Sequence, residues 1–341
     1  MLHILQMTHY AGPTMNTQPG STAAITVVGP ADVFPKVTLV PPLPSVFIIV
    51  ALEIDHRLPI AYFWESRRKK AAIGALKGAA KSLSAMDGVL DATVFKTWIA
   101  PPGRGEYLKQ RPEVAIARYD LVLLLELENA DTARAVRASD DWAAILDAAA
   151  KLARKSLVLS AKNVRRMGSV DHSRDGVFLF NYFYADNLAQ NLAIWEYTAG
   201  WFQDQTGLDN STLLVPDADQ GSDYMVINHC RWYRARDILP SLIFKKSFKQ
   251  FVLANCNANR VAPIPLLLAH FAAALVAIRM PPSSIQRLMA ATRFSPRSYL
   301  PFTMRRWVKS CRSTEPRRER STRVTPRSRR RSISCLTSPA T

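Results

Sequence analysis

The chain has 341 residues, 48% of them apolar, and a formal net charge of +18, which is enough apolar content for one large or two small hydrophobic cores. Residues 293–341 contain 14 Lys and Arg and two Glu, so +12 of this charge lies in the last segment. The charge therefore does not mark the rest of the chain as a nucleic-acid-binding surface, and a folded, soluble enzyme or binding protein is expected.

The four cysteines argue against two kinds of small scaffold. None forms a CxxC pair, and Cys230 has a neighbouring His229 but no histidine pair at the spacing of a structural zinc site. Cys311 and Cys335 lie in the basic last segment, so a secreted disulfide framework is not expected. This usage is typical of a reducing cytoplasm, and neither a metal nor another cofactor is expected.

Residues 1–44 are predicted to form a disordered leader. The first ~36 of them mix Thr, Pro, Gly and Met and lack the charged and apolar regions of a secretory signal. Two later apolar runs, residues 37–54 and 261–278, are interrupted by prolines and fall short of a clean membrane span of about 20 residues. No membrane segment is therefore expected.

Apolar runs and turn signals divide the first predicted domain, residues 45–165, into six elements. Strands are expected where apolar residues cluster, and helices where they recur at three- and four-residue spacing. The expected elements are a strand over 46–54, a helix over 62–86, strands over 89–99 and 119–127, a helix from Asn129 or Asp131 to Leu146, and a last strand at 157–159.

The second predicted domain, residues 172–270, repeats this order. Asn187 is placed to cap a helix, and Gly207 follows where the end of that helix favours positive φ. Pro263 and Pro265 lack backbone N–H groups, so the last strand is expected at a sheet edge or with an irregular course. The expected elements are a strand over 177–184, a helix over 188–206, strands over 213–215 and 224–232 paired as a hairpin, a helix over 236–258 and a strand over 261–268.

Both domains share the order strand, helix, strand, strand, helix, strand. This is the ferredoxin-like order, in which one antiparallel sheet has two helices on one face. The sequence therefore predicts an α+β protein made of two ferredoxin-like domains, and a tandem duplication explains the repetition. The second face of each sheet needs a cover.

The strand that ends at Trp232 carries the candidate catalytic residues. Because side chains alternate along a strand, Tyr224, Asn228 and Trp232 are expected on one face and His229 on the other. Carboxamide and indole N–H groups on an apolar face can hold an enolate or phenolate oxygen, with Tyr182 on the neighbouring strand as a third donor. His229 is a candidate general base, because an imidazole titrates near neutral pH.

Aromatic side chains are expected to wall a substrate pocket beside these donors. A plainer interpretation stays open, in which Asn228, Trp232 and the aromatic residues satisfy backbone groups and fill the core, and His229 is a satisfied core or surface residue. The candidate substrate-binding residues are Trp195, Tyr197, Trp201 and Tyr224.

The tandem order of elements, over about residues 45–268, resembles the dimeric α/β-barrel superfamily, which includes the antibiotic-biosynthesis monooxygenases and the EthD-like proteins. Asn228 and Trp232 are similar to the Asn and Trp that monooxygenases of this group place on a strand beside the substrate. The acidic-Trp signature on the second helix of such domains has a similar run here, Ser139-Asp140-Asp141-Trp142 followed by Ile145-Leu146.

This resemblance implies that the two sheets pack face to face and form an intramolecular barrel. It also implies oxygenation of a phenolic or polyketide-like substrate without metal or flavin, with Asn228 and Trp232 on the developing oxyanion. No histidine can be matched to the haem ligand of the haem-degrading members.

The leading hypothesis is therefore a cytoplasmic small-molecule enzyme of secondary or aromatic metabolism, a cofactor-independent monooxygenase acting on a small aromatic substrate as a monomer or homodimer. A cyclase or isomerase would use the same pocket. The competing class is a non-catalytic protein that binds a ligand, or that contacts nucleic acid or an anionic surface through the tail. Residues 271–341 are expected to hold a helical segment and a disordered Arg/Ser-rich tail, a composition that an out-of-frame gene end would also produce.

Overall fold

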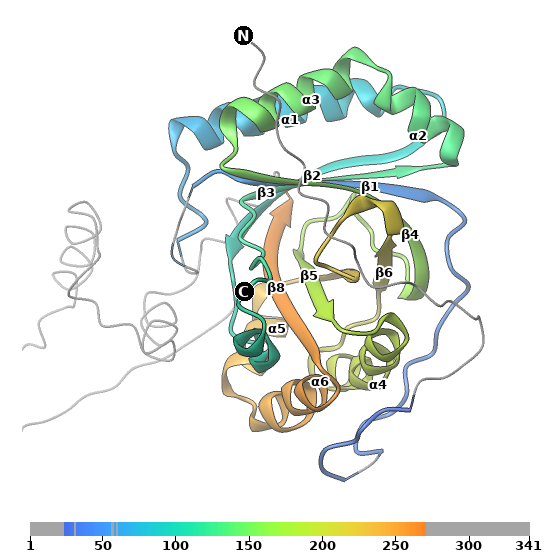
Figure 1. Ribbon diagram of the computed structural model, residues 1–341, viewed down its shortest axis with the longest axis vertical. Coiled ribbons are helices and arrows are strands. Elements are labelled where there is room, and N and C mark those ends of the chain that lie inside the picture. The colour runs from blue at the N-terminus through green and yellow to red at the C-terminus, as the bar shows by residue number, and fades with distance from the viewer. Residues whose placement is uncertain (1–23, 31, 56–57, 59–60, 271–341) are drawn as a thin grey trace, which may run out of the picture. The chain divides into compact units, whose positions relative to one another are not determined.

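The computed structural model describes residues 24–270 apart from 31, 56, 57, 59 and 60 (Figure 1). The first half forms a four-stranded antiparallel sheet with the strand order β4-β1-β3-β2. Its elements are β1 (Val46–Glu53), α1 (Arg67–Leu83), β2 (Val89–Ile99), the 3-10 helix η1 (Glu106–Gln110), β3 (Leu121–Leu127), α2 (Ala130–Arg137), α3 (Asp140–Leu152) and β4 (Lys155–Gly168).

The second half repeats this arrangement, with the strand order β8-β5-β7-β6. The ferredoxin-like order predicted for each half is confirmed, as is the hairpin of β6 and β7. The elements are β5 (Val177–Ala185), α4 (Leu188–Thr206), β6 (Ser211–Pro216), the 3-10 helix η2 (Ala218–Gln220), β7 (Val226–Trp232), α5 (Ala235–Phe244), the π-helical segment η3 (Phe248–Leu253), α6 (Ala254–Ala258) and β8 (Val261–His270).

Two further strand pairs join the halves edge to edge. β2 pairs with β8, and β4 pairs with β6, so the eight strands close into one antiparallel barrel. The inner faces of both sheets meet in the interior, where Ile49 and Leu124 of the first half share one core with Phe178, Phe180 and Ile264 of the second. The prediction of two ferredoxin-like units that form an intramolecular barrel is confirmed.

Helices cover the outer faces of the two sheets on opposite sides of the barrel (Figure 1). α1 and α3 cover the first half, where Leu76 and Ile145 share a core with Ile48 and Val50 of β1. α4, α5 and α6 cover the second half. None of the helices in the described ranges has the length and apolar character needed to cross a membrane.

Two of the expected helices are divided. The stretch after Asn129 is two helices, because Ala138 ends α2 and the hydroxyl of Ser139 accepts from Trp142 N to begin α3. The stretch expected over 236–258 turns at Lys245, whose ψ of 118° is extended and whose Nζ donates to Gln205 O. Apolar spacing continues across both breaks, so periodicity alone predicted one helix in each place.

Two of the expected strands need comment. β4 has 14 residues, far more than the three expected. The expected strand was too short because charged residues along β4 interrupt the apolar pattern. β8 pairs with β5 along most of its length but with β2 only at its end, and Gly105 N donates to Pro263 O beyond that pairing. The nitrogens of Pro263 and Pro265 therefore face the side where β8 has no ladder partner, which agrees with the expected edge character.

The prediction of a disordered leader is wrong for most of residues 24–44. The side-chain oxygens of Asn259 and Asn255 accept from the backbone N–H groups of Thr26 and Val28, each at 2.8 Å. Further along, the ring of Phe34 packs on that of Phe251, with centroids 4.7 Å apart. These asparagines replace the ladder that a strand would have. The remainder of the leader and the predicted tail lie outside the described residues.

The strap formed by residues 24–44 crosses α4 at a glycine. A Cβ added at Gly200 would lie 1.9 Å from Pro35 O, so we expect Gly200→Ala to displace the strap and lower the free energy of unfolding by about 1–3 kcal/mol. Denaturant unfolding measures this. Gly74→Ala on α1 is the matched control, because its Cβ would meet no atom within 4 Å and it should stabilise by up to about 1 kcal/mol. Equal stability of Gly200→Ala and the wild type would contradict the close approach.

Candidate functional site

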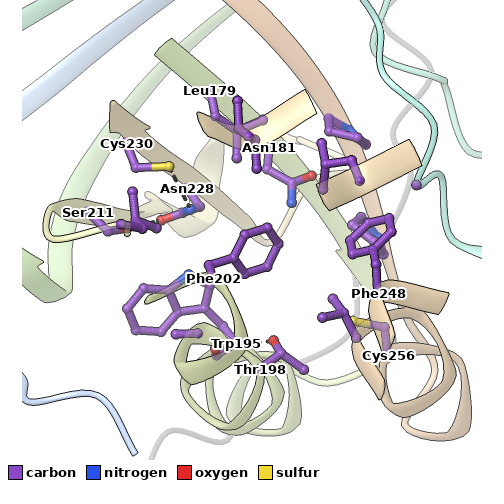
Figure 2. Close-up of a pocket in the computed structure, with 18 of the residues that line it drawn as sticks. Leu179, Asn181, Trp195, Thr198, Phe202, Ser211, Asn228, Cys230, Phe248 and Cys256 are labelled. Carbon is purple, nitrogen blue, oxygen red and sulfur yellow. Dashed lines mark hydrogen bonds between the residues drawn. The ribbon is translucent and has the colours of Figure 1, made fainter. Parts of the chain in front are cut away.

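An apolar cavity lies between the outer face of the second sheet and the helices that cover it (Figure 2). β5 and β7 form its floor, α4, α5 and η3 form its walls, and the loop at Pro102 and Gly103 reaches it from the first half. Its free volume is about 50 Å³, which is room for a few water molecules. The lining includes Leu179, Asn181, Trp195, Thr198, Phe202, Ser211, Asn228, Cys230, Trp232, Phe248, Val252 and Cys256.

Two carboxamides face this cavity from neighbouring strands. Asn181 on β5 and Asn228 on β7 are direct partners in the register, so their side chains leave the same face of the sheet. Figure 2 shows both on the sheet side of the cavity, with Trp195 and Phe202 across from them. Alternation along β7 had predicted the position of Asn228 but not its pairing with Asn181.

The hydrogen-bonding capacity of these carboxamides is only partly used. Asn228 Oδ1 accepts from Ser211 Oγ at 2.5 Å, while its Nδ2 lies 3.9 Å from Cys230 Sγ, a weak acceptor. Asn181 is 8% exposed, and its Oδ1 has no hydrogen-bond partner among the described residues. A buried acceptor without a partner costs about 1–3 kcal/mol, so a ligand that donates a hydrogen bond here would be favoured.

Trp232 lines the cavity, but its N–H group is already engaged. Trp232 Nε1 donates to Thr206 Oγ1 at 2.9 Å, which ties β7 to the last turn of α4. The indole therefore offers the cavity an apolar surface rather than the expected oxyanion donor.

Tyr182 and Tyr224 lie on the opposite side of the sheet, inside the barrel. Tyr182 pairs in register with Ile227, and its ring centroid is 5.2 Å from that of Tyr224. Burial raises the pKa of Tyr182 well above its ordinary value, which keeps its hydroxyl neutral. The expected third donor is thus in the wrong compartment, and Asn181, one residue earlier on β5, occupies the position assigned to it.

The expectation that Tyr224 shares a face with Asn228 is wrong for a local reason. β7 begins only at Val226, and Tyr224 N bonds Ser222 Oγ in the preceding turn. Strand alternation does not extend through a turn, so the tyrosine ring enters the barrel interior instead.

His229 also points into the barrel, where it lies against Phe95, Phe178 and Phe180. Burial, together with the charge of His172, lowers the pKa of His229 well below its ordinary value. It cannot act as a base for a substrate in the outer cavity, because the sheet separates the two. Sequence reasoning found no carboxylate partner for it and missed a contact with His172, which lies 57 residues away along the chain.

The expected aromatic wall is present in part. Trp195 lines the cavity, whereas Trp201 bonds Ser247 Oγ through Nε1 at 3.0 Å and Tyr197 packs on Phe251. The lining residues that sequence reasoning missed, Phe248 among them, come from elements whose facing directions only the fold decides.

The cavity carries no formal charge from the described lining residues. None of them is Asp, Glu, His, Lys or Arg, and the titratable ones are the thiols of Cys230 and Cys256. Burial raises the pKa of Cys230 and raises that of Cys256 to about 12. Among the described residues, no group of three or more His, Cys, Asp and Glu could hold a metal ion.

The strand order of each half and the closure of the eight strands are those implied by the family resemblance. The chain has the dimeric α/β-barrel fold. No family model matches it, and no curated protein does.

Among solved structures, it is similar to an anthrone oxidase-like protein (9% identity, 66% of this chain and 91% of that chain, TM-score 0.49) and to a mutant chlorite dismutase from Candidatus Nitrospira defluvii (10%, 68% and 93%, TM-score 0.37). A third is a dimeric protein of unknown function and ferredoxin-like fold from Bacteroides fragilis (14%, 36% and 99%, TM-score 0.26). Likeness at this level carries nothing about activity.

The two buried thiols give a test of the cavity. Because thiolates react and thiols do not, we expect Cys230 and Cys256 to resist iodoacetamide in the folded protein at mildly alkaline pH and to react once denaturant is added. Mass spectrometry of the two peptides measures this. Modification of either residue at the same rate with and without denaturant would contradict their enclosure.

Proposed function

We propose that the chain is a small-molecule monooxygenase that oxidises a phenolic or polyketide-like substrate in the outer cavity without metal or flavin. The supporting observation is the pair of carboxamides, Asn181 and Asn228, held in register in an otherwise apolar cavity with hydrogen-bonding capacity unused. A substrate that combines a flat apolar body with a few oxygen atoms complements this lining.

In the proposed reaction, the ionised substrate meets dioxygen inside the cavity. Asn228 Nδ2, whose present acceptor is a sulfur atom at 3.9 Å, donates to the enolate or phenolate oxygen and stabilises its charge. Asn181 Oδ1 accepts from a second substrate group. An activated methylene then becomes a carbonyl: dioxygen supplies the new oxygen atom, and its other atom leaves as water with the two methylene hydrogens. No external reductant is needed for this balance.

The cavity determines which substrates qualify. Because its described lining offers no base, the substrate itself must be acidic enough to ionise. Because the free volume is about 50 Å³, smaller than the ligand pockets of roughly 300–1,000 Å³ that proteins use for larger molecules, a polycyclic substrate requires the rings of Phe202 and Phe248 to move.

A ligand-binding protein without catalysis is the second candidate. The lack of any charged or basic side chain in the described lining favours it, since binding needs no proton transfer. Nucleic-acid contact through the basic tail concerns residues outside the described part of the chain.

Oxygen uptake with a panel of anthrones and phenols tests the first candidate. Asn228→Leu should lower kcat/KM by about 10²–10³-fold, the usual effect of removing one oxyanion donor, and Asn181→Leu should lower it about tenfold. Asn191→Leu on α4 is the matched control, since this buried carboxamide also has no hydrogen-bond partner among the described residues but does not line the cavity. Tight binding of panel members with no oxygen consumption would contradict the monooxygenase and support the ligand-binding protein.

The pH profile separates a substrate-driven reaction from one with an enzyme base. We expect kcat/KM to rise with pH, with a midpoint that follows the pKa of each substrate, because the described lining has no group that titrates near neutral pH. Initial rates for substrates of different acidity measure this. A midpoint that stays the same across the panel would show that the protein supplies the base.

A further inference from the structure

A chain of hydrogen bonds joins three titratable side chains at one end of the barrel, apart from the outer cavity. Nδ1 of His172 lies 2.8 Å from Asp91 Oδ2, and Nε2 of His172 lies 2.8 Å from Nε2 of His229. Nδ1 of His229 lies 3.1 Å from Leu179 O. Asp91 belongs to the first half and His229 to the second, while His172 lies in the connector, residues 169–176, that joins β4 to β5.

The partners at each end determine where the protons are. Leu179 O can only accept, so Nδ1 of His229 carries a proton. Because burial lowers the pKa of His229, its ring is neutral and its Nε2 is an acceptor. His172 must then donate through Nε2. Its Nδ1 faces the Asp91 carboxylate, which also accepts, so His172 carries both protons and a positive charge.

The charges around the chain agree with this assignment. Burial acts to raise the pKa of Asp91, but hydrogen bonds from His172 and Thr93 outweigh it and hold that pKa below its ordinary value. The pKa of His229 is lowered by burial and by the charge on His172. The charged residues nearby are Glu126 of β3 and Arg166 of β4, which line the same cavity as the two histidines, Asp171 and Arg174 of the connector, and Arg231 of β7, which bonds Asp175 O.

The connector covers a second cavity, and the hydrogen bonds of His172 hold the connector in place. This cavity, of about 200 Å³, lies at the mouth of the barrel. Ser169, Val170 and His172 of the connector line it from one side, and Phe47 and Leu124 of the barrel interior line it from another. His172 is 13% exposed at its side chain and Asp91 30%, so solvent reaches the outer end of the hydrogen-bond chain.

We propose that His172 is a proton-operated latch that holds the connector across the mouth of the barrel. The closed latch needs both N–H groups of His172, one for each half of the barrel. A neutral imidazole ring has only one N–H group. Loss of the proton therefore breaks one of the hydrogen bonds of His172 to Asp91 and His229 and frees the connector. The closed state therefore binds one proton more than the open state, and the latch opens as pH rises.

Hydrogen exchange of the peptide that covers residues 169–176 tests this, with labelling times scaled to the intrinsic exchange rate at each pH. The wild type should lose protection about tenfold or more as pH rises, as expected for a lost charge-assisted hydrogen bond. In Asp91→Asn the loss should begin at lower pH, because the charge that holds the proton is gone. His172→Gln should show no pH dependence, and the β1 peptide, which lies outside the latch, should not change.

Two results would overturn the latch. One is protection of the connector that does not change with pH in the wild type, or that changes equally in His172→Gln. The other comes from nitrogen NMR of the intact protein labelled in its histidines, which needs no substitution. There, His172 should show two protonated nitrogens in the closed state and His229 only Nδ1–H, and a neutral His172 in the closed state would exclude the mechanism.

Discussion

Edge-to-edge pairing between the two half-barrels is the constraint on which the rest of the structure depends. A ferredoxin-like sheet with helices on one face leaves an apolar second face and two open edges. The β2–β8 and β4–β6 pairs close those edges, and closure turns both second faces inward, where Leu124 and Phe178 share one core. A single chain thus supplies the cover that each sheet lacks.

Closure also separates the molecule into two chemical compartments. Along β7, Asn228 and Cys230 face the outer cavity, while His229 between them faces the barrel interior. The two compartments differ in charge, since the described lining of the outer cavity is uncharged and the barrel mouth holds Glu126, Arg166 and two histidines. Residues adjacent in sequence therefore cannot act on the same ligand.

Fusion of the halves adds one element that two separate subunits would not have. The connector between β4 and β5 has to pass the mouth of the barrel, and His172 on it contacts a residue from each half. On the outside, the strap of residues 24–44 crosses α4 at Gly200. Near its start, its backbone N–H groups donate to the side chains of Asn255 and Asn259. Both segments lack the regular periodicity of helices or strands, yet polar side chains from distant elements hold them in place.

The sequence by itself determined the order of elements and the start and end of α4, because Asn187, the apolar spacing and Gly207 are local signals. It also placed Asn228 and His229 on opposite faces of one strand, since alternation is a local property. Only the tertiary structure decided which compartment each face meets, that Asn181 rather than Tyr182 stands beside Asn228, and that the Trp232 indole is bound to Thr206. The physical reason is that these pairings join segments far apart in the chain, as His172 joins Asp91 across 81 residues, and no spacing within one segment encodes them.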